Sequence, residues 1–536
     1  MPKQDGKTSA TYAGDGIEGK LSHSMDRRKF CGLAAAAGLI GSQGFAAVAA
    51  QNRERVTVSD IVMMDGLELS RSIRSKILSC REVMTAYLDH IERFNPKVNA
   101  IIMLRDRADL LREADTRDAE LARGDYGGWM HGFPQAVKDL SDVKGLRTTW
   151  GSPLFVQNIA IQDSAFVARM RKAGSIFIGK TNTPEFGLGS QSYNTVHGTT
   201  LNAYDQTKTA GGSSGGAAVA LALRMVPVAD GSDFAGSLRN PAAYNNVFGM
   251  RPSFGRVPDS GGELFVSQLG VAGPMARTVS DLAMLLAVQA GPDPRAPLSI
   301  EQDPALYTEP LKRDFKQTRI GWLGDFKGYL AMEPGVMELC KTSFKAFESI
   351  GCVIEDAHTD FSLDQLWTAT VILRNWMVGG GLGALYKDPA KRARLKPEAQ
   401  WEVERGLALS AEDVYKASTL RSDWYRAVLK LFDHYDYLLL PTAQVFPFDA
   451  KLHWPKAING RAMDSYHRWM EIVLPITMSG CPAINVPVGF NAQGLPMGVQ
   501  IVGRNHGEQA VMQLAYAYEQ ATGWVQNHLP PLLLSA

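Results

Sequence analysis

Short apolar runs bounded by Gly, Pro or Asn alternate with amphipathic stretches along most of the chain. Runs of this length and setting are typical of strands in a buried sheet. The clearest are residues 132–140, 175–182, 319–324, 436–443, 482–490 and 498–503. Apolar residues recur at helical spacing in 163–173, 278–291, 334–349 and 506–521. This alternation predicts an α/β fold with helices on both faces of a sheet.

Three further stretches have a helical pattern. Residues 67–95 repeat apolar side chains at helical intervals, and the charged stretch 105–124 continues in the same way, so both are expected to be outer helices. Residues from about 370 to 475 are mostly helical in pattern and rich in aromatic residues. Two interpretations stay open for this last region, because aromatic residues are common both in sites and in cores. It is either an insertion that shapes a pocket or ordinary helix packing.

Composition narrows the class of protein. Of the 536 residues, 45% are hydrophobic and 21% are charged, which is enough apolar material for a packed core. The formal net charge is +1, whereas proteins that bind nucleic acid usually carry a concentrated basic excess, so no nucleic-acid partner is expected. The near-neutral charge therefore favours a protein that acts on a small molecule. No internal repeat or low-complexity linker is visible in residues 51–536, and composition does not decide between one large core and several domains.

The N-terminus has the pattern of an export signal. Arg27 and Arg28 precede Phe30, an Ala- and Gly-rich segment follows, and the small residues 47–49 resemble a cleavage site. This order is typical of a twin-arginine signal, which predicts a periplasmic protein and leaves residues 1–50 out of the fold. Glycines and polar residues interrupt the apolar run, so no stable membrane insertion is expected after removal of the signal.

Cysteine usage indicates neither a metal site nor a redox motif. One of the five cysteines falls in the predicted signal, and the other four contain no Cys-x-x-Cys pair. A twin-arginine signal implies export of an already folded protein, for which disulfides are not required. We therefore expect buried free thiols at Cys80, Cys340, Cys352 and Cys481.

The stretch 209–223, TAGGSSGGAAVALAL, is the strongest local signal of chemistry. A phosphate-binding loop would need Lys and then Ser or Thr after its glycines, but Ala217 and Ala218 follow here. A dinucleotide fingerprint would need a buried strand before it, and the preceding residues are polar. A nucleotide cofactor is therefore not expected.

A nucleophile elbow fits this stretch better. Residues 212–216 satisfy G-x-S-x-G with Ser214 in the centre, and an apolar helix follows. The strand half of the motif is absent, and no histidine stands in a distinguishing context. An α/β-hydrolase esterase that uses Ser214 and a histidine remains an alternative.

Two other residues complete a different pattern. Ser237 lies in a second small-residue turn, GSDFAGSLRNP, and Lys138 ends the first predicted strand. Ser213 lies 24 positions before Ser237, and Lys138 lies 99 positions before it. These elements resemble the amidase signature family, and similar segments continue through nearly all of residues 51–536. The resemblance implies a single domain with a central mixed, twisted and largely buried sheet, and a reaction without metal or organic cofactor.

The resemblance also implies roles for these three residues. Lys138 takes a proton from Ser213, Ser213 takes one from Ser237, and Ser237 attacks the substrate carbonyl to form an acyl-enzyme. A lysine can act as this base only when it is neutral, and burial favours the neutral form because the ammonium loses its hydration. Small residues at 212–216 let the backbone approach the site closely.

Further roles are carried over to the turn that holds Ser237. Backbone N–H groups of Phe234, Ala235, Gly236 and Ser237 are the expected oxyanion-hole donors. The family often has Gly where this chain has Ala235, and a positive φ there would add strain of order 1 kcal/mol. We expect alanine to be accommodated, because it keeps the N–H donor.

Five other residues near these motifs are expected to support the site without taking part in the reaction. Ser214 is expected to fix its turn, Asp233 and Arg239 to hold the nucleophile turn, and Lys180 and Glu185 to serve as scaffold.

The predicted function is hydrolysis of a small-molecule carboxylic amide to a carboxylate and an amine or ammonia. The same machinery acts on the forming oxyanion, so esters, carbamates and aryl amides are further candidate substrates. Besides the esterase, two alternatives stay open: a glutamine-hydrolysing subunit of a tRNA amidotransferase and a non-catalytic binding protein on the same scaffold.

Overall fold

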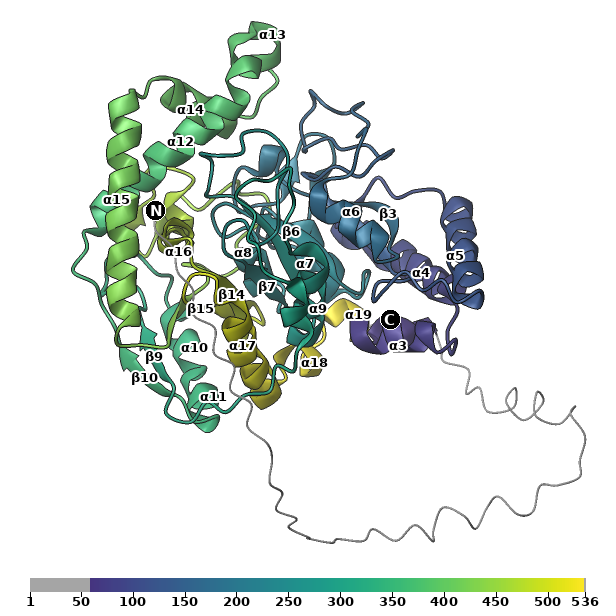
Figure 1. Ribbon diagram of the computed structural model, residues 1–536. Helices are drawn as coiled ribbons and strands as arrows, with labels where there is room; N and C mark the ends of the chain where they lie inside the picture. The colour runs from purple at the N-terminus through teal and green to yellow at the C-terminus, as the bar shows by residue number, and fades with distance from the viewer. Residues whose placement is uncertain (1–57, 535–536) are drawn as a thin grey trace, which may run out of the picture. The chain divides into compact units, whose positions relative to one another are not determined.

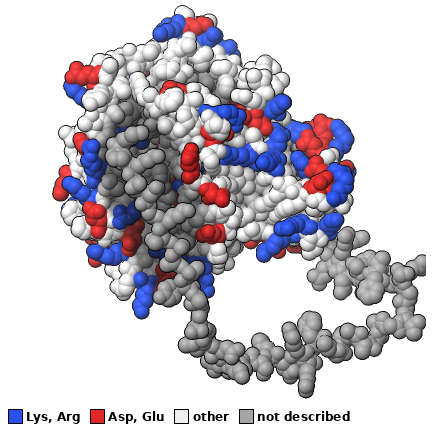
Figure 2. All heavy atoms as spheres, viewed as in Figure 1, with Lys and Arg blue, Asp and Glu red and all other residues white. Residues whose placement is uncertain are grey.

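The computed structural model of the protein describes residues 58–534, which belong to one compact unit (Figure 1). The predicted export signal, residues 1–50, lies outside the described residues. None of the described helices combines the length and apolarity needed to cross a membrane. On the face shown in Figure 2, Lys and Arg side chains are interspersed with Asp and Glu.

An eight-stranded mixed sheet forms the centre of this unit. Its order is β10 (Val353–Asp356), β9 (Arg319–Trp322), β11 (Tyr437–Pro441), β15 (Pro496–Val502), β14 (Ala483–Phe490), β7 (Phe248–Arg251), β8 (Val271–Ala276) and β6 (Ala229–Asp233). The pairs β10–β9 and β9–β11 are parallel, and every later pair is antiparallel. The prediction of a mixed sheet is confirmed.

A three-stranded sheet adjoins the β6 edge. It consists of β1 (Ile101–Ile102), β3 (Ile176–Thr181) and β2 (Pro134–Lys138), with β2 and β3 parallel. The buried carboxylate of Asp230 on β6 accepts hydrogen bonds from Lys138 N–H at 3.1 Å and from Gln135 Nε2 at 3.3 Å. These contacts hold the end of β2 beside β6.

Helices cover both faces of the central sheet, as predicted. The central strands β11 and β15 are buried at every residue, which requires cover on both sides. The helices that surround the sheets are α2 (Val58–Met63), α3 (Gly66–Arg74), α4 (Cys80–Val98), α5 (Arg107–Ala122), α6 (Ala165–Lys172), α7 (Gly215–Ala222), α8 (Arg239–Tyr244), α9 (Val279–Gln289), α10 (Val336–Thr342), α11 (Phe344–Ser349), α16 (Leu474–Ser479), α17 (Glu508–Thr522), α18 (Trp524–Asn527) and α19 (Pro531–Leu534).

A helical insert lies between β10 and β11, at the upper left of Figure 1. It comprises α12 (Leu363–Lys387), α13 (Pro389–Arg392), α14 (Pro397–Leu407) and α15 (Ala411–Phe432). A Cβ atom added to Gly406 of α14 would lie 2.0 Å from the carbonyl oxygen of Asn375 on α12. The two helices therefore touch backbone to backbone, which only glycine permits. The predicted helical region 370–475 is interrupted by β11, which belongs to the central sheet.

All six predicted strands are present, but two of the helix predictions were too long. The expected helix 67–95 is two helices, α3 and α4, and the expected helix 334–349 is also two, α10 and α11. Ser79 starts α4 with a capping box to Glu82, which favours a new helix start at that position. Ile77, which fitted the helical spacing, lies in the turn between α3 and α4 and is 59% exposed.

Four strands of the central sheet were not predicted from the sequence. These are β6, β7, β8 and β10. The strand β6 reads ADGSD and has no apolar run, and β8 contains the Gly-Pro pair that usually marks a turn. Tertiary pairing overrides weak strand propensity at these positions.

The cysteine prediction is confirmed for the described residues. Cys80, Cys340, Cys352 and Cys481 are free and buried. Burial raises the pKa of the Cys481 thiol to about 11 and that of Cys352 to about 12, so both stay protonated near neutral pH.

Candidate active site

Lys138 lies at the end of β2 and is 0% exposed. Its ammonium nitrogen is 2.8 Å from Ser213 Oγ, 2.8 Å from Ser214 Oγ and 3.0 Å from Ser232 Oγ. An ammonium has three N–H donors, and three neutral hydroxyl groups accept from them here. No carboxylate of the described residues forms an ion pair with this lysine.

Burial dominates the titration of Lys138. Loss of hydration lowers the pKa of its side chain to about 7, although the nearby carboxylates of Asp230 and Asp233 act in the opposite direction. Near neutral pH the group is therefore divided between its charged and neutral forms. The neutral form is a base that can accept a proton from a bound hydroxyl.

The turn before α7 supplies two of the three hydroxyls. The Gly212–Ser213 peptide bond is cis, and Ser214 is the N-cap of α7. A Cβ atom at Gly216 would lie 2.4 Å from the backbone nitrogen of Asn182, so glycine lets α7 contact the end of β3 directly. The Ser214 N–H also donates to the Ser237 carbonyl at 3.2 Å, which ties this turn to the second serine turn.

Ser232 is a member of this hydroxyl cluster that the sequence did not predict. It lies on β6 two residues after Asp230, and alternate residues of a strand point to the same face. Asp230 contacts the backbone of Lys138, and Ser232 contacts its side chain. Recognition of 229–233 as a strand would have placed both residues toward β2.

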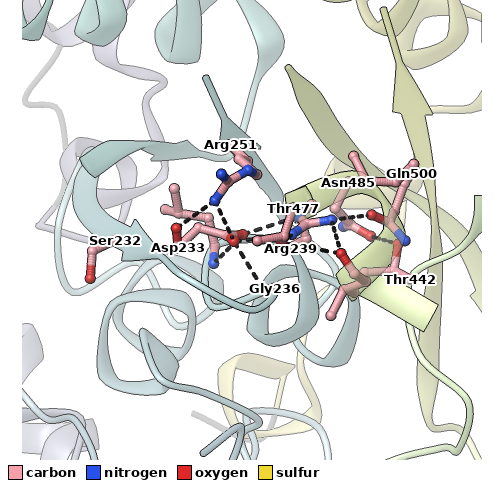
Figure 3. Close-up of polar contacts among 12 residues, drawn as sticks. Ser232, Asp233, Gly236, Arg239, Arg251, Thr442, Thr477, Asn485 and Gln500 are labelled. Atoms are coloured by element: carbon pink, nitrogen blue, oxygen red, sulfur yellow. Dashed lines mark hydrogen bonds and ion pairs between the residues drawn. The ribbon is translucent and has the colours of Figure 1, made fainter. Parts of the chain in front are cut away.

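Asp233 ends β6 and organises the turn that carries Ser237 (Figure 3). Its carboxylate accepts from Arg239 at 3.0 Å and from Arg251 at 3.2 Å, and all three side chains are fully buried. Burial alone would raise the pKa of this carboxyl, but the two guanidinium groups hold it well below its usual range. Asp233 is therefore ionised and structural.

Arg239 extends this buried network to the C-terminal half of the chain. Its guanidinium donates to the Val473 carbonyl at 3.1 Å, to Thr477 Oγ1 at 2.9 Å and to the side-chain oxygen of Gln500 (Figure 3). Within residues 58–534, these contacts occupy both oxygens of the Asp233 carboxylate and all three nitrogens of the Arg239 guanidinium.

The backbone of residues 234–237 offers fewer free donors than expected. Gly236 N–H donates to Asp233 Oδ1 at 2.9 Å, so the prediction of four available amides was wrong for this residue. In the described part of the chain, no acceptor pairs with the N–H groups of Phe234, Ala235 and Ser237. These three amides remain available to bind an oxyanion.

The substitution of Ala235 for the glycine common in the family causes no backbone strain. Ala235 does not have a positive φ, whereas Gly236 has a φ of 87°. A Cβ atom at Gly236 would also lie 2.6 Å from Val473 Cγ2. The position that requires glycine is therefore 236, and alanine is accommodated at 235 as expected.

A cavity of about 850 Å³ opens over the two serine turns. Ser213, Ser232 and Ser237 line it, and no hydrogen bond joins the hydroxyls of Ser213 and Ser237 in this part of the structure. The rest of the wall is largely apolar, with Leu140, Phe166, Phe186, Leu188, Phe234, Phe254, Val257, Trp376 and Met377 among the lining residues. Its size and lining suit a substrate larger than a simple primary amide.

The helical insert contributes one wall of this cavity. Trp376, Met377, Gly380 and Gly381 of α12 line it. Other aromatic residues of the region 370–475 serve in packing, since Trp424 and Trp469 are 0% and 1% exposed.

The insert also contacts the nucleophile turn through Arg374. Its guanidinium lies 4.8 Å from the centre of the Phe234 ring, and Glu402 of α14 binds it at 3.0 Å. The Phe234 side chain, which neighbours the free amides, is thus held between the cavity and a buried ion pair.

The predicted scaffold residues lie outside the cavity wall. Lys180 donates to the Ser141 carbonyl and to Thr148 Oγ1, and Glu185 accepts from Ser152 Oγ at 2.6 Å. Among the described residues, no group of three or more His, Cys, Asp or Glu side chains is arranged to hold a metal ion.

The esterase alternative with Ser214 as nucleophile was wrong. Ser214 is 0% exposed and is not among the residues that line the cavity, and within the described chain its hydroxyl forms hydrogen bonds only with Lys138 and Ser232. The turn that precedes it follows a loop, whereas a nucleophile elbow follows a strand.

Comparison with known proteins agrees with this geometry. The Amidase family model matches residues 82–512. An acylamidase of Rhodococcus erythropolis is 33% identical over 481 residues, which are 88% of this chain and 98% of that protein. A glutamyl-tRNA(Gln) amidotransferase subunit of Thermosynechococcus vestitus is also 33% identical, over 86% of this chain and 98% of that protein.

A solved structure supports the same assignment. A bacterial aryl acylamidase of the amidase signature family has a TM-score of 0.80 and 27% identity, over 87% of this chain and 97% of that chain. The family match, the relatives and the fold all extend over most of the described residues. The chain therefore belongs to the amidase signature family and is an amidase, a hydrolase of C–N bonds.

Proposed function

We propose that the protein hydrolyses neutral, apolar amides of the acyl- or aryl-amide class, with Ser237 as nucleophile and Ser213 and Lys138 as its proton relay. The observation that carries this proposal is the fully buried Lys138, with a pKa of about 7 and its Nζ 2.8 Å from Ser213 Oγ. Ser213 and Ser237 both line the cavity next to it.

The reaction has two steps. Ser237 Oγ attacks the amide carbonyl carbon while its proton passes to Ser213, and the Ser213 proton passes to neutral Lys138 Nζ. The oxyanion accepts from the free amides of residues 234, 235 and 237, and the C–N bond breaks as the relay returns the proton to the leaving nitrogen. Water then attacks the acyl-enzyme through the same relay, which releases a carboxylic acid and restores Ser237.

The proposed relay requires a hydrogen bond between the hydroxyls of Ser237 and Ser213. Ser213 and Ser237 share the cavity wall without a hydrogen bond between them, and catalytic hydrogen bonds often tighten only when substrate is bound. A rotation of the Ser237 side chain about its Cα–Cβ bond changes the direction of Oγ without moving the backbone held by Asp233.

The cavity wall disfavours an anionic substrate. Among the described residues that line it, none is Lys, Arg or His. Free glutamine would bring an α-carboxylate into this site without a cationic partner, and burial of an unpaired charge is strongly unfavourable. Similarity to an acylamidase and to an aryl acylamidase supports the neutral class over glutamine, although amidotransferase subunits are equally similar in sequence.

The first prediction concerns the nucleophile. Ser237→Ala is expected to lower kcat for an anilide by about a millionfold and to abolish covalent labelling by a fluorophosphonate probe. Ser267→Ala, which changes another serine of the cavity wall, is the matched control. It should keep the wild-type kcat and the covalent labelling. Labelling of the Ser237→Ala protein at wild-type level would contradict the assignment, and an unlabelled wild-type protein would favour a binding protein.

The second prediction concerns pH. Only neutral Lys138 accepts the Ser213 proton, and burial lowers its pKa to about 7, so kcat/KM should rise as pH increases through about 7. Below that range kcat/KM should fall about tenfold per pH unit. A kcat/KM that is flat between about pH 5 and pH 9 would exclude Lys138 as the base.

The third prediction separates the two substrate classes. Because a buried carboxylate without a partner costs several kcal/mol, kcat/KM for a neutral anilide should exceed that for glutamine by about a thousandfold or more. Ammonia release from glutamine and aniline release from the anilide are measured with the same protein preparation. Faster hydrolysis of glutamine than of the anilide, or glutamine hydrolysis that is seen only with co-purified subunits, would favour the amidotransferase alternative.

We also propose that the protein is exported to the periplasm by a twin-arginine pathway, on the basis of Arg27, Arg28 and the segment after them. In a Gram-negative host, anilide hydrolysis by the full chain should appear in the periplasmic fraction. The Arg27→Lys/Arg28→Lys variant should leave that activity in the cytoplasm. Equal distribution of both proteins would refute export by this route.

A further inference from the structure

The middle of α12 contains three consecutive glycines, Gly379, Gly380 and Gly381. Each glycine in a helix interior destabilises the helix by about 1 kcal/mol relative to alanine. A run of three within a 25-residue helix therefore needs a physical reason. Such a reason is a close approach of another backbone or space that must stay empty.

Packing accounts for the first of the three. A Cβ atom at Gly379 would lie 3.0 Å from Gly406 Cα, where α12 and α14 touch backbone to backbone. Any larger residue at 379 would push the two helices apart. Gly379 is buried between them.

Packing does not account for the other two. Among residues 58–534, no atom lies within 4 Å of a Cβ atom added to Gly380 or Gly381. The fold would accept alanine at both positions, and alanine would stabilise the helix. Neither glycine has a positive φ that would exclude a side chain.

These two glycines do line the catalytic cavity. They share it with Trp376 and Met377, which lie four residues earlier on the same helix. Residues four apart in a helix lie on the same face, one turn from each other. The face of α12 toward the cavity thus has two large side chains on one turn and none on the next.

We propose that Gly380 and Gly381 are specificity-determining residues that keep one end of the catalytic cavity open for a bulky apolar group of the amide substrate. This inference rests on the proposed function, because it concerns the substrate of the same cavity. Trp376 and Met377 line the cavity one helical turn before the two glycines and offer apolar contacts to the substrate. Beyond them the bare helix backbone leaves room for the bulky group.

The test is a set of variants in the full-length protein: Gly380→Ala, Gly381→Ala and Gly381→Leu. The substrates are acetanilide, an anilide of a long-chain acid and the acetamide of a bulky aromatic amine, so that the acyl and amine parts grow independently. We expect kcat/KM for one of the two enlarged amides to fall about 10- to 100-fold in Gly381→Leu, and less in the alanine variants. We expect kcat/KM for acetanilide to stay within about twofold, as no catalytic group changes.

Thermal unfolding distinguishes this effect from damage to the fold. The alanine variants should have an unchanged or higher Tm, since alanine replaces glycine in a helix without a clash. Gly383→Ala is the matched control: it lies on α12, its Cβ would meet Leu407 Cδ2 at an ordinary 3.5 Å, and it is not among the cavity residues. It should raise Tm similarly and leave the substrate preference unchanged.

Two outcomes would overturn the inference without affecting the proposed function. One is a wild-type protein that hydrolyses acetanilide but neither larger amide. The other is a Gly381→Leu protein that hydrolyses all three amides with the wild-type order of preference. Failure of the wild-type protein to hydrolyse any of the three would count against the proposed function.

Discussion

The active site depends on the burial of one amino group without a carboxylate partner. Lys138 is surrounded by three serine hydroxyls, while the two nearest carboxylates have other partners: Asp230 accepts from the backbone of β2, and Asp233 accepts from two arginines. A direct ion pair would keep the lysine charged and useless as a base. Hydroxyl partners satisfy the ammonium when it is present, and one of them can donate to the amine when it is not.

The rest of the site supports this arrangement through rigid turns. Both serine turns are held through their own backbone atoms. The turn before α7 contacts the end of β3, and the turn after β6 donates N–H groups to the Asp233 carboxylate. Because Arg239 and Arg251 pair with the Asp233 carboxylate, this buried charge can organise the turn without an ion pair to Lys138. The contacts of Arg239 with Val473 and Thr477 connect the nucleophile turn to elements far along the chain.

The hydroxyl cluster around Lys138 and one wall of the cavity come from different parts of the chain. Strand β2, the turn before α7 and strand β6 with the turn after it supply Lys138 and the serines, whereas the insert between β10 and β11 supplies a wall of the cavity. Arg374 connects the two parts, because its guanidinium packs on the Phe234 ring and forms an ion pair with Glu402. Changes along α12 can therefore alter the shape of the cavity while the hydroxyl cluster stays intact.

The sequence by itself determined the fold class, six of the strands and most of the residues that meet at Lys138. Apolar runs, a lysine at a strand end and two serines in small-residue turns are local features, so they are readable without a structure. Resemblance to a family added the order of the proton transfers. It also suggested four backbone N–H groups as oxyanion donors. Which of them are free depends on the direction of each N–H group, which the sequence does not specify.

Only the tertiary structure decided the features that depend on contacts between distant segments. The strand β6 has no apolar run and is a strand because β8 pairs with it, so Ser232 and its contact with Lys138 could not be predicted. The loss of Gly236 as a free donor follows from the position of the Asp233 carboxylate, which two arginines fix. The open space beside Gly380 and Gly381 likewise depends on which of residues 58–534 approach α12, and no local pattern of residues predicts it.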